Sequence, residues 1–155
     1  MAEDGVRELS ETQERLLDFF AKPMSKLNIW VFRASGGRVG NRFLRGAPVL
    51  LLNTVGRKSG QPRTAPLIYM EDGANLVLVA SKGGSRRHPL WYRNLEASPE
   101  AEVQVGSELR KVRARTASAQ EKDALWPGLL RVYRDYDSYQ ARTRRDIPVV
   151  ILEPR

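Results

Sequence analysis

The pattern of apolar and polar positions divides the chain into a helical first part and a strand-rich remainder. Ser10 and Gln13 form a capping-box pattern, and apolar residues then recur at helical spacing, which predicts a helix over 11–22 that ends at Pro23. A second helical segment follows, with apolar residues on one face between residues 27 and 31. Residues 1–35 are therefore expected to form a helical N-terminal segment.

From residue 48 onward the pattern changes to short runs of β-branched and aliphatic residues. Such runs, bounded by glycine-containing turns, predict β-strands joined as hairpins. We predict strands at 48–55, 63–70, 75–81, 101–105, 109–116 and 147–153. Hairpin-linked strands favour an antiparallel sheet or small barrel, so the fold class is α+β.

Two helices are expected to interrupt this sheet. Pro89 begins a short one that ends near Ser98. Ser118 with Glu121 is another capping box, and it begins a longer helix that is expected to kink at Pro127 and then continue past residue 139.

Length and charge limit the possible functions. The 155 residues suit one domain over 1–155, and 26 basic against 18 acidic residues give a net charge of +8, which favours an anionic partner. The absence of cysteine and the single histidine exclude disulfides, thiol catalysis, Cys-ligated zinc and multi-His metal sites, so no metal is expected. An acidic N-terminus without an apolar core is not a secretory signal, which favours a cytoplasmic protein, with peripheral membrane association left open.

The common catalytic motifs are missing. Neither the dinucleotide fingerprint, nor the phosphate loop, nor the nucleophile elbow has its glycines in place, although the stretches 36–40, 56–59 and 83–87 come near to them. We therefore expect electrostatic binding of a group that carries its own reactivity.

Basic residues concentrate between positions 57 and 93. This window holds seven basic residues against two acidic ones, at loops that a small sheet can bring together. Lys82, Gly83 and Gly84, followed by the helix that Pro89 begins, form a candidate phosphate cradle. The alternative is that each of these charges only solvates a turn.

Three tyrosines at three-residue intervals form a second cluster. Tyr133, Tyr136 and Tyr139 would share one face of a continuous helix. They could simply pack on a core, or they could line a pocket in which a planar ligand stacks and receives a hydrogen bond.

Taken together, these motifs resemble the deazaflavin-dependent nitroreductase family. The resemblance rests on NTVGRKSGQPRTAPL, SKGG, HPLWYRNLEASP, the three spaced tyrosines and the closing IPVVILEP, and it extends from about residue 20 to the C-terminus. It implies a split β-barrel of the FMN-binding type, an oxidoreductase activity and coenzyme F420, an 8-hydroxy-5-deazaflavin with a phosphate and a glutamate tail.

The resemblance also implies roles for individual residues. It assigns Lys58 and Arg63, with Arg57 nearby, to the phosphate or tail, and Tyr136 to the acceptor oxygen in a pocket shared with Tyr133 and Tyr139. The residues expected to line the phosphate and the ring are Ser81, Lys82, Gly83, Gly84, Pro89, Leu90, Trp91 and Asn94. Ser81 is also a candidate catalytic residue, together with the three tyrosines.

One position departs from the family nitroreductase pattern. Ile68 stands where an aromatic residue is expected, and Tyr69 cannot replace it because neighbouring strand residues face opposite sides. Quinone-like acceptors are therefore expected rather than bulky nitroaromatic compounds, although the family's range extends to nitro and activated-alkene acceptors.

Other interpretations predict different partners. An FMN-binding split-barrel reductase would share the architecture, and a carrier would bind F420 without turnover. Nucleic acid is the least favoured partner, because the charge lies in loops rather than along a helix face. The N-terminal segment, with Phe19, Phe20, Trp30 and Phe32 beside Lys22, Lys26 and Arg33, could contact an anionic membrane or pack over the barrel as a lid.

Overall fold

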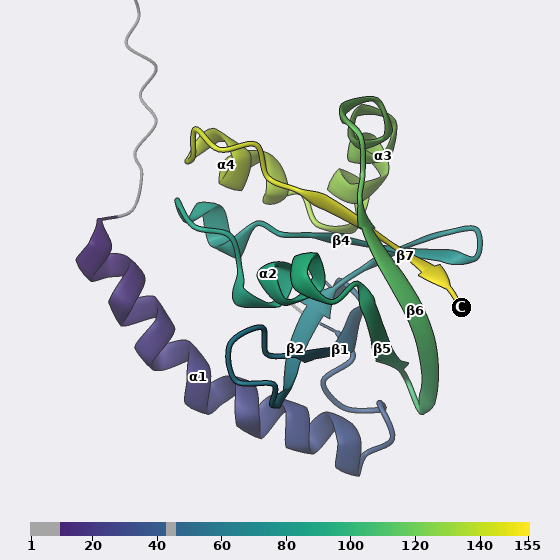
Figure 1. The fold of residues 1–155 in the computed structure, drawn as a ribbon. Helices are drawn as coiled ribbons and strands as arrows, with labels where there is room; N and C mark the ends of the chain where they lie inside the picture. The colour runs from purple at the N-terminus through teal and green to yellow at the C-terminus, as the bar shows by residue number, and fades with distance from the viewer. Residues whose placement is uncertain (1–9, 43–45) are drawn as a thin grey trace, which may run out of the picture.

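A computed structural model describes residues 10–42 and 46–155 of the chain, except for the side chains of 16–25. Seven strands and four α-helices, with one short 3₁₀ helix, make up its named elements (Figure 1). In chain order these are α1 (Glu11–Ala34), β1 (Val49–Val55), β2 (Pro62–Ile68), β3 (Met70–Asp72), β4 (Asn75–Val79), η2 (Lys82–Gly84), α2 (Leu90–Ala97), β5 (Glu100–Val105), β6 (Glu108–Thr116), α3 (Ala119–Val132), α4 (Tyr136–Ala141) and β7 (Val149–Pro154).

The strands form one antiparallel sheet that curls into a split barrel. Their order is β2-β1-β5-β6-β7-β4-β3, so β2 and β3 lie at opposite ends of the order although only Tyr69 separates them in the chain. The sheet must curl to bring these ends together. The predicted strand 63–70 is therefore wrong as a single strand, because its first part pairs with β1 and its last residue, Met70, pairs with β4.

Side-chain alternation separates two apolar clusters, one on each face of the curled sheet. On β4, Leu76 and Leu78 belong to the interior cluster, whereas Val77 and Val79 belong to the cluster beneath α3 and α4. Because alternate strand residues face opposite sides, one strand supports both the barrel interior and the helices that cover it.

The N-terminal helix is longer than the pattern predicted. The α1 helix runs without interruption from Glu11 to Ala34, so the prediction that Pro23 ends it is wrong. A proline in a helix interior removes one helical hydrogen bond, and packing of α1 on the rest of the protein can outweigh this local loss. Near its C-terminal end Phe32 is 1% exposed, and Arg33 donates hydrogen bonds to Asn53 and Thr64 of the sheet.

The C-terminal helical region was predicted to continue past residue 139 as one helix, but it is interrupted near Tyr133. The α3 helix continues through Pro127, and the helix ends at Tyr133, whose backbone is extended with a φ of −152°. A new helix, α4, begins at Tyr136. The three tyrosines therefore do not share one face of a continuous helix, although their rings still meet.

Candidate functional site

The predicted phosphate cradle is a tight 3₁₀ turn with left-handed backbone. Lys82, Gly83 and Gly84 have φ values of +44°, +62° and +83°. A Cβ atom on Gly84 would lie 2.8 Å from the carbonyl oxygen of Tyr139, so the turn packs directly against α4. A Cβ on Gly83 would meet no atom within 4 Å, so the backbone there is open to a ligand.

Arg145 holds this turn in place, although no sequence motif pointed to this residue. Its guanidinium donates hydrogen bonds to three backbone carbonyls, those of Ser85 (2.7 Å), Ser81 (2.8 Å) and Ala80 (3.1 Å). Burial lowers the pKa of Arg145 from its usual value. Three carbonyls from one short stretch are thus fixed by a single planar side chain, which matches the geometry of a guanidinium.

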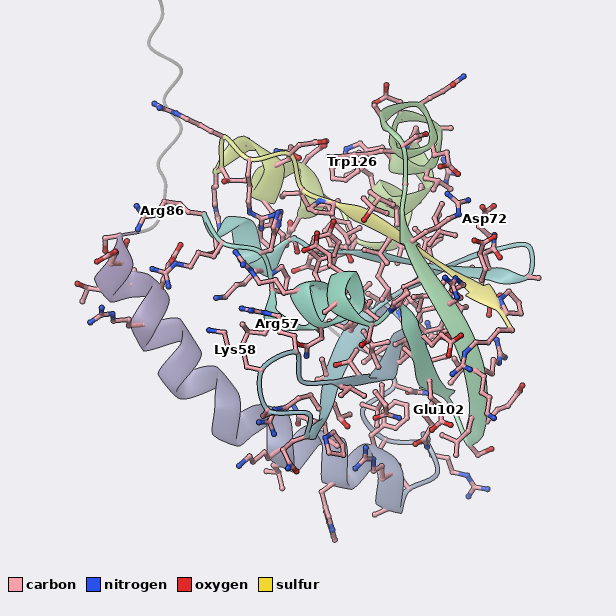
Figure 2. All side chains as sticks on the ribbon, viewed as in Figure 1. Arg57, Lys58, Asp72, Arg86, Glu102 and Trp126 are labelled. Carbon is pink, nitrogen blue, oxygen red and sulfur yellow. The ribbon has the colours of Figure 1, made fainter. Side chains whose placement is uncertain are left out.

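The second basic loop connects β1 to β2 and is tied to α2. The side chain of Asn94, 6% exposed, accepts a hydrogen bond from the backbone N–H of Arg57 (3.1 Å) and donates one to the hydroxyl of Thr54 (3.1 Å). Arg57 and Lys58 are exposed, and in Figure 2 their side chains extend on the side of the molecule where Arg86 and the first part of α1 also lie. Asn94 therefore positions the loop through its backbone.

The remaining residues predicted to bind the cofactor differ in their exposure and in their contacts. Arg63 is exposed on β2, with a guanidinium nitrogen 3.5 Å from the Ser59 hydroxyl. Pro89 is the buried residue before α2, and Leu90 is 66% exposed at the start of that helix. Trp91 instead packs against the interior cluster of the barrel.

The three tyrosines form one aromatic cluster beside the cradle. Ring centroids are 5.2 Å apart for Tyr133 and Tyr136, 6.0 Å for Tyr133 and Tyr139, and 6.4 Å for Tyr136 and Tyr139. The hydroxyls of Tyr133 and Tyr139 share a hydrogen bond of 3.0 Å. Burial, more than any other cause, raises the pKa of both Tyr133 and Tyr136, so these phenols stay protonated.

The hydroxyl of Tyr136 differs from the other two. Tyr136 is 4% exposed, and its hydroxyl makes no hydrogen bond to any residue that the structure describes. No described side-chain oxygen is both sealed from the surface and without a partner, so the Tyr136 hydroxyl oxygen is not completely enclosed. It is a protonated hydroxyl within an apolar cluster.

Ile68 and Tyr69 face opposite sides, as the strand alternation predicted. Ile68 packs against the cluster that contains the tyrosines, whereas Tyr69 packs against the barrel interior. The wall of the tyrosine cluster formed by β2 is therefore aliphatic.

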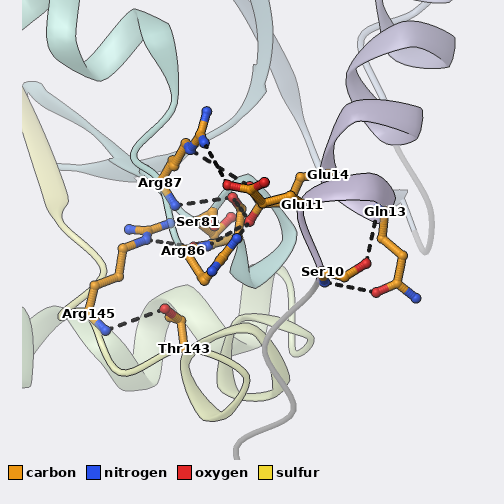
Figure 3. A network of polar contacts seen from close by, with 10 residues as sticks. Ser10, Glu11, Gln13, Glu14, Ser81, Arg86, Arg87, Thr143 and Arg145 are labelled. Carbon is orange, nitrogen blue, oxygen red and sulfur yellow. Dashed lines mark hydrogen bonds and ion pairs between the residues drawn. The ribbon is translucent and has the colours of Figure 1, made fainter.

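A polar network that the motif analysis missed joins α1 to the segment after the cradle (Figure 3). Glu14, 5% exposed, accepts hydrogen bonds from the Ser85 hydroxyl (2.8 Å) and from the backbone N–H of Arg86 (3.1 Å). Its carboxylate also lies 3.9 Å from the Arg86 guanidinium and 4.0 Å from that of Arg87. Arg86 and Arg87 belong to the basic window, but nothing in the pattern of the N-terminal segment singled out Glu14.

The described residues contain no cluster of three His, Asp or Glu side chains that could hold a metal ion. Within the same part of the chain, no helix is long and apolar enough to cross a membrane.

Comparisons with known proteins agree on one family. Residues 24–154 match the family described as F420H(2)-dependent quinone reductase. A Mycobacterium tuberculosis protein named F420H(2)-dependent quinone reductase is 41% identical over 133 residues, which cover 84% of this chain and 89% of that protein. A second protein of the same organism, whose name also describes an F420H(2)-dependent quinone reductase, is 47% identical over 118 residues, which cover 76% of this chain and 99% of that protein.

Solved structures support the same assignment. An F420-H2 dependent reductase, FDR-A, is 39% identical with a TM-score of 0.64, over 68% of this chain and 94% of its own. The antiparallel split barrel, the basic loops and these relatives together show that the chain belongs to the F420H(2)-dependent quinone reductase family.

Proposed function

We propose that this protein binds reduced coenzyme F420 with its phosphate at the cradle and its ring beside the adjoining tyrosine cluster, and that it reduces a quinone there. The observation that carries the proposal is the direct packing of the Lys82–Gly84 turn against Tyr139 of α4. Because of this contact, the basic turn with its open backbone and the aromatic cluster border the same region of the protein. A flat ring attached to an anionic chain needs both surfaces.

The residues of the two loops fit such a cofactor. Gly83 offers an open left-handed backbone, and the exposed Lys58 and Arg63 offer positive charge on the neighbouring loop and strand. Under this proposal Lys58, Arg63 and Lys82 hold the phosphate, with Arg57 nearby. Ser81 and the start of α2 lie at the edge of the ring, where Pro89, Leu90, Trp91 and Asn94 support it.

The reduced deazaflavin supplies the hydride, and the protein supplies position and hydrogen bonding. Tyr136 donates its hydroxyl proton in a hydrogen bond to the acceptor oxygen, which stabilises the negative charge that develops there. Tyr133 and Tyr139 hold each other through their shared hydrogen bond and keep the pocket aromatic and poor in water.

The first test is cofactor binding. We expect oxidised F420 to quench tryptophan fluorescence on titration and FMN to bind far more weakly. Lys58→Ala and Arg63→Ala should each raise the Kd for F420 by about tenfold, because each removes a charge-assisted contact. Lys111→Ala, which removes an exposed lysine from β6, is the matched control and should leave the Kd unchanged. Tighter binding of FMN would assign the fold to the flavin-binding alternative.

The second test is turnover with reduced F420 and menadione. We expect reoxidation of the cofactor, and Tyr136→Phe should lower kcat by about tenfold or more while the Kd for F420 is unchanged. Tyr92→Phe removes a hydroxyl that bonds Thr116 away from the cluster and is the control. Binding without turnover of any quinone would favour the carrier alternative.

The aliphatic side chain of Ile68 bears on the choice of acceptor. We propose that it leaves room for compact quinones and gives no aromatic surface to bulky nitroaromatic compounds, so menadione should be reduced faster than a nitroimidazole. Ile68→Tyr should raise the relative rate with the nitro compound; equal rates in the parent protein would contradict the proposal.

A second proposal concerns peripheral contact with an anionic membrane. Leu27 and Trp30, 62% and 68% exposed, lie three residues apart on α1 beside the exposed Lys26. Phe32 does not take part, because it is buried, and Arg33 is engaged with the sheet. The side chains of Phe19, Phe20 and Lys22 lie outside the described residues. Co-sedimentation with phosphatidylglycerol vesicles should fall for Leu27→Ser/Trp30→Ser and remain for Val39→Ser, another exposed apolar position.

A further inference from the structure

The Glu14 carboxylate is an internal anion bound at the end of the basic cradle. It is buried, it accepts two hydrogen bonds from the segment that directly follows Gly84, and two guanidinium groups lie at ion-pair distance. Burial alone would raise the pKa of Glu14, but the bonds from Ser85 and Arg86 and the charges of Arg86 and Lys82 lower it. The side chain is therefore ionised, and it lies within the field of the cradle lysine.

An anionic cofactor bound at the cradle would compete with the Glu14 carboxylate for the positive charges of Lys82, Arg86 and Arg87. Like charges at one site repel, and a buried carboxylate cannot be screened as a surface one is. The donor set suits a carboxylate, because one oxygen takes the Ser85 hydroxyl and the Arg86 N–H while the other faces Arg87. The glutamate tail of F420 carries the same chemical group.

We propose that Ser85, Arg86 and Arg87 form a carboxylate subsite that Glu14 fills in the free protein and that a tail carboxylate of F420 takes on binding. This inference rests on the proposed function. Exchange is feasible because α1 is anchored independently by Phe32 and Arg33 near its other end. In Figure 1 the helix extends from β1 and β2 toward the segment after η2, so the two anchored regions lie at opposite ends of α1. Under this proposal the N-terminal end releases while the other end stays attached.

Cofactor forms that differ only in the tail test the subsite. The Kd of each protein is measured for F420 with several glutamates and for the form that keeps the phosphate but has none. We expect Glu14→Gln to tighten binding of the long-tailed form by about tenfold and to change the short form by less than twofold. Glu11→Gln removes the same charge one turn earlier, at an exposed side chain that lies 3.9 Å from Arg87, and should change neither value by more than twofold.

The outcomes separate the two proposals. If the parent protein binds neither form, the proposed function and the subsite both fail. If it binds both, and Glu14→Gln binds the long-tailed form no better or tightens both forms equally, F420 binding stands and the subsite assignment is overturned. Hydrogen exchange tests the displacement without any variant. The amides of residues 13–15, the first in α1 to be hydrogen-bonded, should exchange faster when long-tailed F420 is bound, and slower exchange would overturn the displacement of Glu14.

Discussion

At the scale of single residues, Arg145 decides the shape of the cradle. The left-handed conformation at Lys82 is strained for a residue with a side chain, and it persists only if the surroundings hold it. Arg145 does so by bonding carbonyls on both sides of the turn, at Ser81 and Ser85. A positioning residue of this kind touches no ligand and still controls where the cradle N–H groups point.

Replacing Arg145 with lysine tests this role. Lysine keeps the charge but not the planar fork, so we expect the free energy of unfolding to fall by about 2 kcal/mol and the Kd for F420 to rise by about tenfold. Urea unfolding and fluorescence titration measure the two effects. Arg144→Lys, at the exposed neighbouring position, should show neither; equal losses in both variants would mean that Arg145 has no special role.

The buried tyrosines make stability depend on alkaline pH. The pKa of Tyr136 is raised mainly by burial, so the folded protein keeps a proton that the unfolded chain releases above about pH 10. The free energy of unfolding should therefore fall above pH 10, by about 1.4 kcal/mol per pH unit for this group. Urea unfolding between pH 9 and 11 should show a shallower fall for Tyr136→Phe. Parallel curves would show that the phenol ionises normally.

At the scale of elements, the contact between the η2 turn and α4 couples cofactor binding to the tyrosine cluster. Gly84 permits that contact, because a Cβ there would press on the backbone of Tyr139. Gly83 has a similar left-handed φ but open space around it. A side chain at Gly83 would therefore cause backbone strain alone, whereas a side chain at Gly84 would cause backbone strain and a steric clash with α4.

Alanine at each glycine tests the coupling. Gly83→Ala should reduce the free energy of unfolding by about 1 kcal/mol, because alanine is strained in the left-handed region, and should raise the Kd for F420, because the methyl group enters the space proposed for the phosphate. At saturating F420 its kcat with menadione should stay close to that of the parent. Gly84→Ala should reduce it by more than about 2 kcal/mol and should also lower kcat, since α4 must shift. Equal effects of the two substitutions would show that η2 and α4 are not coupled.

The same scale shows what local patterns predicted. Capping boxes at Ser10 and Ser118 correctly placed the starts of α1 and α3, because a cap is satisfied within one turn. Where each helix continues or ends was harder to predict. Pro23 did not end α1, and the predicted continuation of the helix past residue 139 failed at Tyr133, whose ring packs with Tyr136 and Tyr139 against the outer face of the sheet. Tertiary packing thus overrode the local signal.

At the scale of the whole molecule, the strand order contains pairings that could not be predicted from the sequence. Strand runs and hairpins could be predicted, but the pairing of β1 with β5 and of β4 with β7 joins segments far apart in the chain, and no local pattern specifies it. The Glu14 contact with Ser85 spans 71 residues and was equally hidden. The basic loops and tyrosines were predicted as candidates, and their cofactor roles stay predictions, as does the single domain over 1–155.

The net charge of +8 bears on partner choice, because it attracts any polyanion. If the charge acts mainly through the cradle and the β1–β2 loop, the Kd for F420 should rise roughly tenfold between 50 and 500 mM NaCl, and Lys58→Ala should flatten that dependence. A 20-base-pair DNA duplex, titrated by fluorescence anisotropy, should bind more weakly than about 1 µM at 150 mM salt, since the loops offer no helix face or strand ribbon to a groove. Tighter DNA binding that Lys58→Ala and Arg86→Ala both abolish would instead mean that the basic surface serves nucleic acid, and the tyrosine cluster would then lack a function.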